Sequence, residues 1–91
     1  MYTVAEYHYF DGSVFVVARK DNRSYKRLPT DAKHPSNNSP AYRAIKDGNL
    51  SHITIVEENL SKETAFIYCN CIVKYLRSKG QVVLNVRDHK L

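Results

Sequence analysis

Residues 51–85 read SHITIVEENLSKETAFIYCNCIVKYLRSKGQVVLN, and the order of apolar and polar residues in this stretch decides the fold. An apolar run at residues 53–56 predicts a short buried strand that ends at Glu57 and Glu58. A long amphipathic helix follows, and a second apolar run at residues 81–86 predicts a last strand. The stretch therefore predicts a strand, a helix and a strand in that order.

The sequence marks both ends of this helix and its buried face. Ser61 offers an N-cap oxygen, Glu63 places a negative charge in the first turn, and Gly80 can end the helix. Its apolar residues recur at steps of three and four, which is the spacing of one helix face. These residues are Ala65, Phe66, Cys69, Ile72, Val73 and Leu76. We therefore expect the helix to pack against the core.

The N-terminal residues predict a β-hairpin. Residues 2–10 and 13–18 are rich in Val, Tyr and Phe, and the Asp11-Gly12 pair between them predicts an antiparallel hairpin with a tight two-residue turn. This pair is typical of such turns because glycine accepts a positive φ angle.

Two further segments connect the hairpin to residues 51–85. Residues 21–28 predict a short helix, and residues 29–39 predict an exposed loop. Ser39 can cap a second helix that has Pro40 at its first position and Gly48 just past its end.

These elements predict one α+β domain spanning residues 1–91. It would contain a small mixed or antiparallel sheet, made of the N-terminal hairpin and two later strands, packed with helices. Its 91 residues, of which 43% are hydrophobic and 25% charged, suit a single core.

No segment approaches the roughly 18 apolar residues of a membrane span, and the N-terminus lacks the pattern of a secretion signal. We expect a cytoplasmic protein.

The net charge of +5 is concentrated in residues 19–46, which carry eight basic residues against two acidic ones. Basic side chains interleaved with aromatic ones can neutralise phosphates and stack on bases, so this segment predicts a nucleic-acid-binding face. A solvated basic loop is the alternative. The candidate binding residues are Arg19, Lys20, Arg23, Tyr25, Lys26, Arg27, Tyr42, Arg43 and Lys46.

The cysteines and histidines predict no metal site. Cys69 and Cys71 are two residues apart on the predicted helix, so their side chains point about 200° away from each other and we expect two reduced thiols. The four histidines have separations that match no zinc-ligand spacing. They are His8, His34, His52 and His89. We therefore expect no metal or other cofactor on these grounds.

Nearly the whole chain resembles the GIY-YIG nuclease family. The matching segments are DGSVFVVA, RKDNRSYKR, SPAYRAIKDG and ITIVEENLSKETAF, the last continuing through CIVKYL to LN. Members of the family cleave phosphodiesters with one divalent metal, usually magnesium, held by a glutamate of the long helix. A hairpin tyrosine is thought to activate or orient water, and an arginine stabilises the phosphate. The resemblance implies a GIY-YIG-like fold.

Most of the catalytic residues implied by this resemblance are replaced. The second hairpin tyrosine of the family falls on Val16, the glycine after it on Ala18, and the first tyrosine on or near Ala5. Cys69 occupies the expected position of the glutamate, and a thiol is a poor ligand for magnesium. Arg23 alone matches, as the family's arginine.

Other residues offer substitutes for a catalytic site. Tyr7 and Tyr9, or His8 as a general base, can face a cleft from the first strand, but strand alternation does not place all three on one face. Glu63 can reach toward a metal from the helix start. The alternatives are cross-strand packing for the tyrosines, an exposed histidine and a helix-dipole role for Glu63.

Three functions follow from these observations. The leading hypothesis is a catalytically degenerate GIY-YIG-like domain that binds nucleic acid through its basic face. The second is a protein-binding inhibitor or decoy, of the kind that phages and other viruses encode, whose basic face meets an acidic partner. The third is an active endonuclease with a divergent site that needs Arg23 and Mg²⁺ or Mn²⁺.

Overall fold

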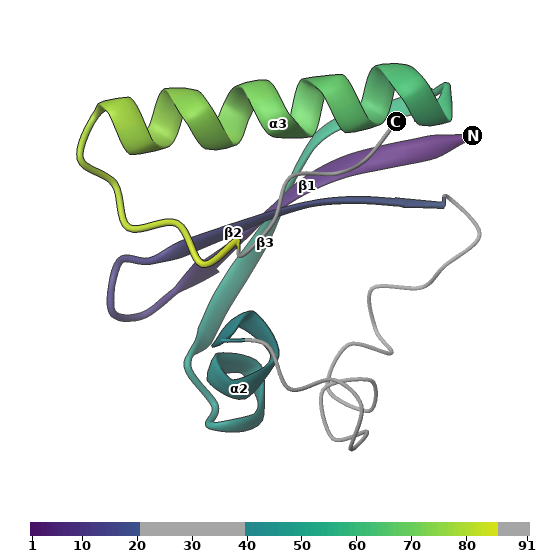
Figure 1. The fold of residues 1–91 in the computed structure, drawn as a ribbon. Coiled ribbons are helices and arrows are strands. Elements are labelled where there is room, and N and C mark those ends of the chain that lie inside the picture. Colours follow the sequence, from purple (N-terminus) through teal and green to yellow (C-terminus); the bar gives the residue numbers. More distant parts are fainter. Residues whose placement is uncertain (21–39, 86–91) are drawn as a thin grey trace.

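The structure is a computed structural model that describes residues 1–20 and 40–85. Its strands form one antiparallel sheet in the order β2-β1-β3, with α3 over one face and α2 against the other (Figure 1). The elements in chain order are β1 (Tyr2–Tyr9), β2 (Val14–Lys20), α2 (Pro40–Lys46), β3 (Leu50–Leu60) and α3 (Lys62–Ser78). The predicted α+β class is confirmed.

The hairpin between β1 and β2 forms as predicted, but its turn is longer. The Tyr9 N–H donates to the Ser13 carbonyl and the Gly12 N–H donates to the Tyr9 carbonyl, both at 3.0 Å. Gly12 has a φ of 89°, whereas a type I′ turn would need a positive φ at Asp11 as well. Phe10, Asp11 and Gly12 therefore form a three-residue loop instead of the expected two-residue turn.

Strand β3 is longer and more exposed than the sequence predicted. It runs for 11 residues at one edge of the sheet, and Ile55 within it is 42% exposed. Ile55 pairs with Ala5, whose side chain belongs to the α2 side of the sheet, so α3, which packs mainly on β1 and β2 on the other face, does not cover it. The prediction of a strand at residues 53–56 is confirmed, and the prediction that it is buried is wrong.

Both predicted ends of α3 are confirmed. The Ser61 hydroxyl accepts a hydrogen bond from the Thr64 N–H at 3.2 Å. At the other end Gly80 has a φ of 81°, and the N–H groups of Gly80 and Gln81 each donate to a carbonyl of the preceding turn at 3.0 Å. This pair of bonds is the Schellman motif, which favours glycine at the position of Gly80.

Helix α2 also begins and ends where the sequence indicated. Pro40 is its first residue, and Gly48 follows its end with a φ of 76° and donates its N–H to the Ile45 carbonyl at 3.0 Å. The predicted helix at residues 21–28 and the predicted loop at 29–39 lie outside the described residues. Within the described parts of the chain, no helix is long and apolar enough to cross a membrane.

The predicted last strand is reduced to one bridge in the described residues. Val83 pairs with Val14 in parallel, and the chain then continues beside β2. Asn85 bonds Val16 through its side chain, with its Oδ1 accepting from the Val16 N–H at 3.0 Å. Up to Asn85, where the described residues end, a side chain thus takes the place of a backbone partner of β2 after the bridge at Val83.

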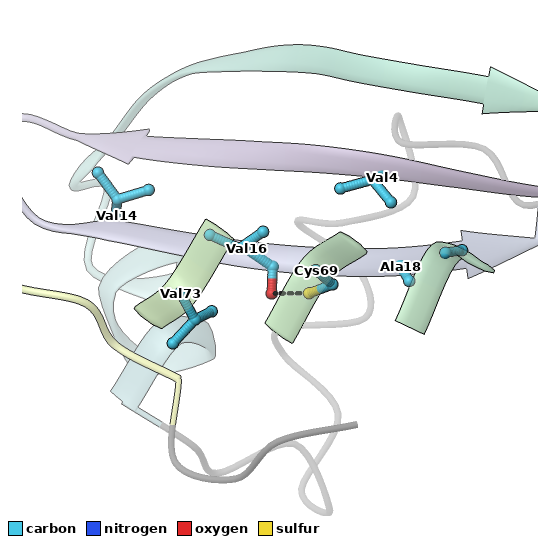
Figure 2. Close-up of a cluster of buried hydrophobic side chains, with 7 residues drawn as sticks. Val4, Val14, Val16, Ala18, Cys69 and Val73 are labelled. Carbon is cyan, nitrogen blue, oxygen red and sulfur yellow. Dashed lines mark hydrogen bonds between the residues drawn. The ribbon is translucent and has the colours of Figure 1, made fainter. Parts of the chain in front are cut away.

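The core has two parts, one on each face of the sheet. Under α3 the buried residues are Val4, Val14, Val16, Ala18, Ala65, Cys69 and Val73 (Figure 2). On the α2 side they are Ala5, Tyr7, Tyr9 and Ile45. Three residues of the predicted helix stripe, Ala65, Cys69 and Val73, are thus confirmed as core residues.

Candidate functional site

The position at which the resemblance implies a metal-binding glutamate lies inside the core. Cys69 is fully buried on α3, and its Sγ donates to the Val16 carbonyl at 3.4 Å (Figure 2). Val16 is also fully buried, and Ala18 is 9% exposed. At the place where the resemblance implies a metal, α3 and β2 therefore pack together through apolar groups and one weakly polar thiol.

Ala5, the position that the resemblance implies for the first tyrosine, does not join this group. Ala5 belongs to the core on the opposite face of the sheet, while Val4 is the β1 residue that packs with Cys69 and Val16. This difference follows from the alternation of side chains along a strand. Arg23 lies outside the described residues.

Tyr7, Tyr9 and His8 divide between the two faces, as the alternation of the strand predicted. Tyr7 is fully buried and Tyr9 is 4% exposed, both on the α2 side, whereas His8 faces the other way. The Tyr9 hydroxyl donates to the Ala41 carbonyl at 3.2 Å, and burial is the largest cause that raises the pKa of this phenol. These two tyrosines pack the α2 side of the sheet.

Arg19 is not the surface residue that the sequence suggested. Only 6% of it is exposed, and its Nη1 donates to the Tyr7 hydroxyl at 3.2 Å. A buried guanidinium needs such partners because its desolvation is costly. The prediction that Arg19 contacts a phosphate is therefore wrong, because its side chain is buried and bonded to Tyr7.

The other described members of the basic segment lie on the surface or near it. Lys20 ends β2 in an exposed position, and Arg43 and Lys46 are exposed in the last turn of α2. Tyr42 is half-buried, with its ring centroid 6.4 Å from that of Phe15. It packs on the sheet and is less open for stacking than predicted. The remaining candidates, Arg23, Tyr25, Lys26 and Arg27, lie outside the described residues.

A polar cluster on the α3 side of the sheet was missed in the sequence. His8 pairs with His52 across β1 and β3, and their rings stack at 4.5 Å with an angle of 7°. Glu6 Oε1 lies 3.2 Å from His8 Nε2, and Ser51 Oγ lies 3.1 Å from His52 Nδ1. The sequence does indicate that Glu6 and His8 share one face of β1, because they are two residues apart on a strand. The position of His52 depends on a strand register that the sequence does not reveal.

This cluster offers imidazole nitrogens, a carboxylate and a hydroxyl as hydrogen-bonding groups. It does not resemble a metal site as it stands, because two parallel imidazole rings do not direct their nitrogens to one point. Over residues 1–20 and 40–85, no group of three or more His, Cys, Asp or Glu residues is placed to hold a metal ion.

Two other residues that the sequence singled out lie on the exposed side of α3. Glu63 is exposed in the first turn, six residues before Cys69, so about 9 Å of helix separates their Cα atoms along the axis. Cys71 is an exposed thiol, while Cys69 is buried. The predicted divergence of the two cysteines is confirmed.

Comparisons with protein-family models, with curated proteins and with solved structures found no match for this chain.

Proposed function

We propose that this chain is a GIY-YIG-like domain that has lost its catalytic site and binds nucleic acid. The burial of Cys69 against Val16 carries this proposal, because the resemblance implies a carboxylate and a tyrosine there. A carboxylate at such a buried position would be strongly desolvated unless a metal or hydrogen bonds compensated it. Apolar packing in its place favours a binding role over phosphodiester cleavage.

The binding face would be centred on the connection between β2 and α2. The exposed cations Lys20, Arg43 and Lys46 come before and after residues 21–39 in the sequence, and that segment contributes four more cations. Each phosphate that such a cation neutralises releases counterions, so the affinity should fall steeply as salt concentration rises. Sequence preference is expected to be weak, because phosphate contacts carry no direct base information.

Fluorescence anisotropy with labelled single-stranded and duplex DNA and RNA tests this function. We expect binding at low salt that weakens at least about tenfold near physiological salt. Arg43→Glu combined with Lys46→Glu should weaken it further. A matched variant, Lys62→Glu combined with Lys79→Glu, makes the same change of charge at the two ends of α3 and should have a much smaller effect.

Two outcomes would end the proposal. One is the absence of detectable affinity for every probe at low salt. The other is an equal loss of affinity in the α2 and α3 variants, because this would mean that the total charge matters and the proposed face does not.

A further inference from the structure

Helix α3 has a second apolar stripe, which does not belong to the core. Ile67, Tyr68 and Tyr75 are 45%, 40% and 58% exposed, and Cys71 beside them is exposed as well. With Thr64 and Ile72 they line an open groove of about 420 Å³ along the helix. Large exposed side chains gathered in this way are typical of an interaction surface.

The spacing of the stripe indicates that its occupant is another helix. Thr64, Tyr68, Cys71 and Tyr75 follow one another at steps of four, three and four. This alternation is the seam along which two helices pack side by side in coiled coils. A small ligand would not require such a repeat along three turns.

We propose that the occupant is α3 of a second copy of this chain, packed antiparallel. With the two helices in opposite directions, Tyr68 of each copy can lie beside Cys71 of the other, and Tyr75 beside Thr64. Each large ring then meets a small side chain, which is the condition for close packing between helices.

The charges beside the stripe favour the antiparallel direction. Glu63 and Lys74 are 11 residues apart, which returns to within about 20° of the same line on a helix, so both flank the Ile67 side of the stripe. They are exposed and separated by about 16 Å along the helix, too far to pair within one copy. An antiparallel partner brings Glu63 of each copy toward Lys74 of the other. A parallel partner would leave the Glu63 and Lys74 side chains of the two copies on opposite sides of the interface, where they could not pair.

Sedimentation analysis over a concentration series up to the millimolar range tests whether the chain dimerises. We expect a reversible dimer, and we expect Tyr75→Lys to raise its dissociation constant at least about tenfold. Phe10→Lys is the matched control, because Phe10 is 72% exposed in the hairpin loop and does not line the groove, so it should leave the dimer unchanged. A monomer at every concentration would overturn the proposal, and so would a dimer that tolerates Tyr75→Lys.

A charge exchange tests the direction of the helices. Glu63→Lys and Lys74→Glu should each weaken the dimer, and the two changes combined should restore it, because opposite charges meet again between the copies. Circular dichroism of each variant checks that the monomer is folded. A double variant that associates more weakly than both single variants would overturn the antiparallel arrangement.

Discussion

Asn85 holds Val16 through both polar atoms of its side-chain amide. Its Oδ1 accepts from the Val16 N–H at 3.0 Å, and its Nδ2 donates to the Val16 carbonyl at 2.7 Å. One side chain thus satisfies two backbone groups of β2, as a neighbouring strand would do. The same carbonyl also accepts from Cys69, so the end of the described chain and α3 meet at Val16.

Asn85→Ala should lower the free energy of unfolding by about 1–3 kcal/mol, because it leaves two backbone groups of β2 without these partners. Urea denaturation followed by circular dichroism measures the change. Asn85→Asp is the matched control, since it keeps the acceptor for the Val16 N–H but faces the Val16 carbonyl with a second acceptor. It should also destabilise the fold. A stability equal to that of the natural chain in both variants would contradict the role of this amide.

Substitution of Cys69 separates a packing role from a metal-binding role. Cys69→Ser keeps the size and a donor for the Val16 carbonyl, and should cost no more than about 2 kcal/mol. Cys69→Glu adds volume and a carboxylate at a fully buried position, and should cost about 3 kcal/mol or more. A Cys69→Glu variant that is stable, and that gains cleavage with Mg²⁺, would show that a metal site remains open there.

The Asp11 carboxylate should stabilise the hairpin loop in a pH-dependent way. The Ser13 hydroxyl and N–H both donate to it, at 2.6 and 2.9 Å, and these bonds hold the pKa of Asp11 below its ordinary value. This stabilisation is present above the pKa of the unfolded chain, about 4, and is lost as the pH falls through the lower pKa of the folded state.

Asp11→Ala should therefore be less stable than the natural chain at neutral pH, and the difference should shrink below about pH 4. Urea denaturation at several pH values measures it. Ser13→Ala removes the hydroxyl donor and should show the same trend more weakly. A difference that stays constant with pH would mean that the charge of Asp11 has no part in holding the loop.

The stabilisation by Tyr9 depends on pH in the opposite direction, because it is lost at alkaline pH. Burial raises the pKa of this phenol, so its contribution to stability is complete below the ordinary pKa of about 10 and is lost as the pH rises further. Tyr9→Phe loses the hydrogen bond to Ala41 and should cost about 1 kcal/mol at neutral pH. The difference in unfolding free energy between Tyr9→Phe and the natural chain should narrow above about pH 10, which urea denaturation at several pH values measures.

Signals contained within a few residues were sufficient to predict much of the fold. Ser61 and Gly80 mark the ends of α3 because capping depends on residues within one turn. The apolar spacing likewise identified Cys69 as a core residue. The alternation along β1 separated His8 from Tyr7 and Tyr9 without any knowledge of the partners of that strand.

Features that depend on distant parts of the chain could not be predicted in this way. The exposure of Ile55 depends on its place in an edge strand on the α2 side of the sheet, and the burial of Arg19 depends on a bond to Tyr7 of the neighbouring strand. The stacking of His8 on His52 needs the register between two strands that are far apart in sequence. Charge and composition alone assigned Arg19 to the surface.

One titration tests the central claim, which is binding without cleavage. A labelled oligonucleotide is titrated with the protein at low salt in the presence of Mg²⁺, its anisotropy is followed, and the same samples are then run on a denaturing gel. The account predicts a rise in anisotropy that salt reverses, with the oligonucleotide intact. Cleavage that requires the metal and is lost in Arg23→Ala, or no rise in anisotropy with any probe, would contradict it.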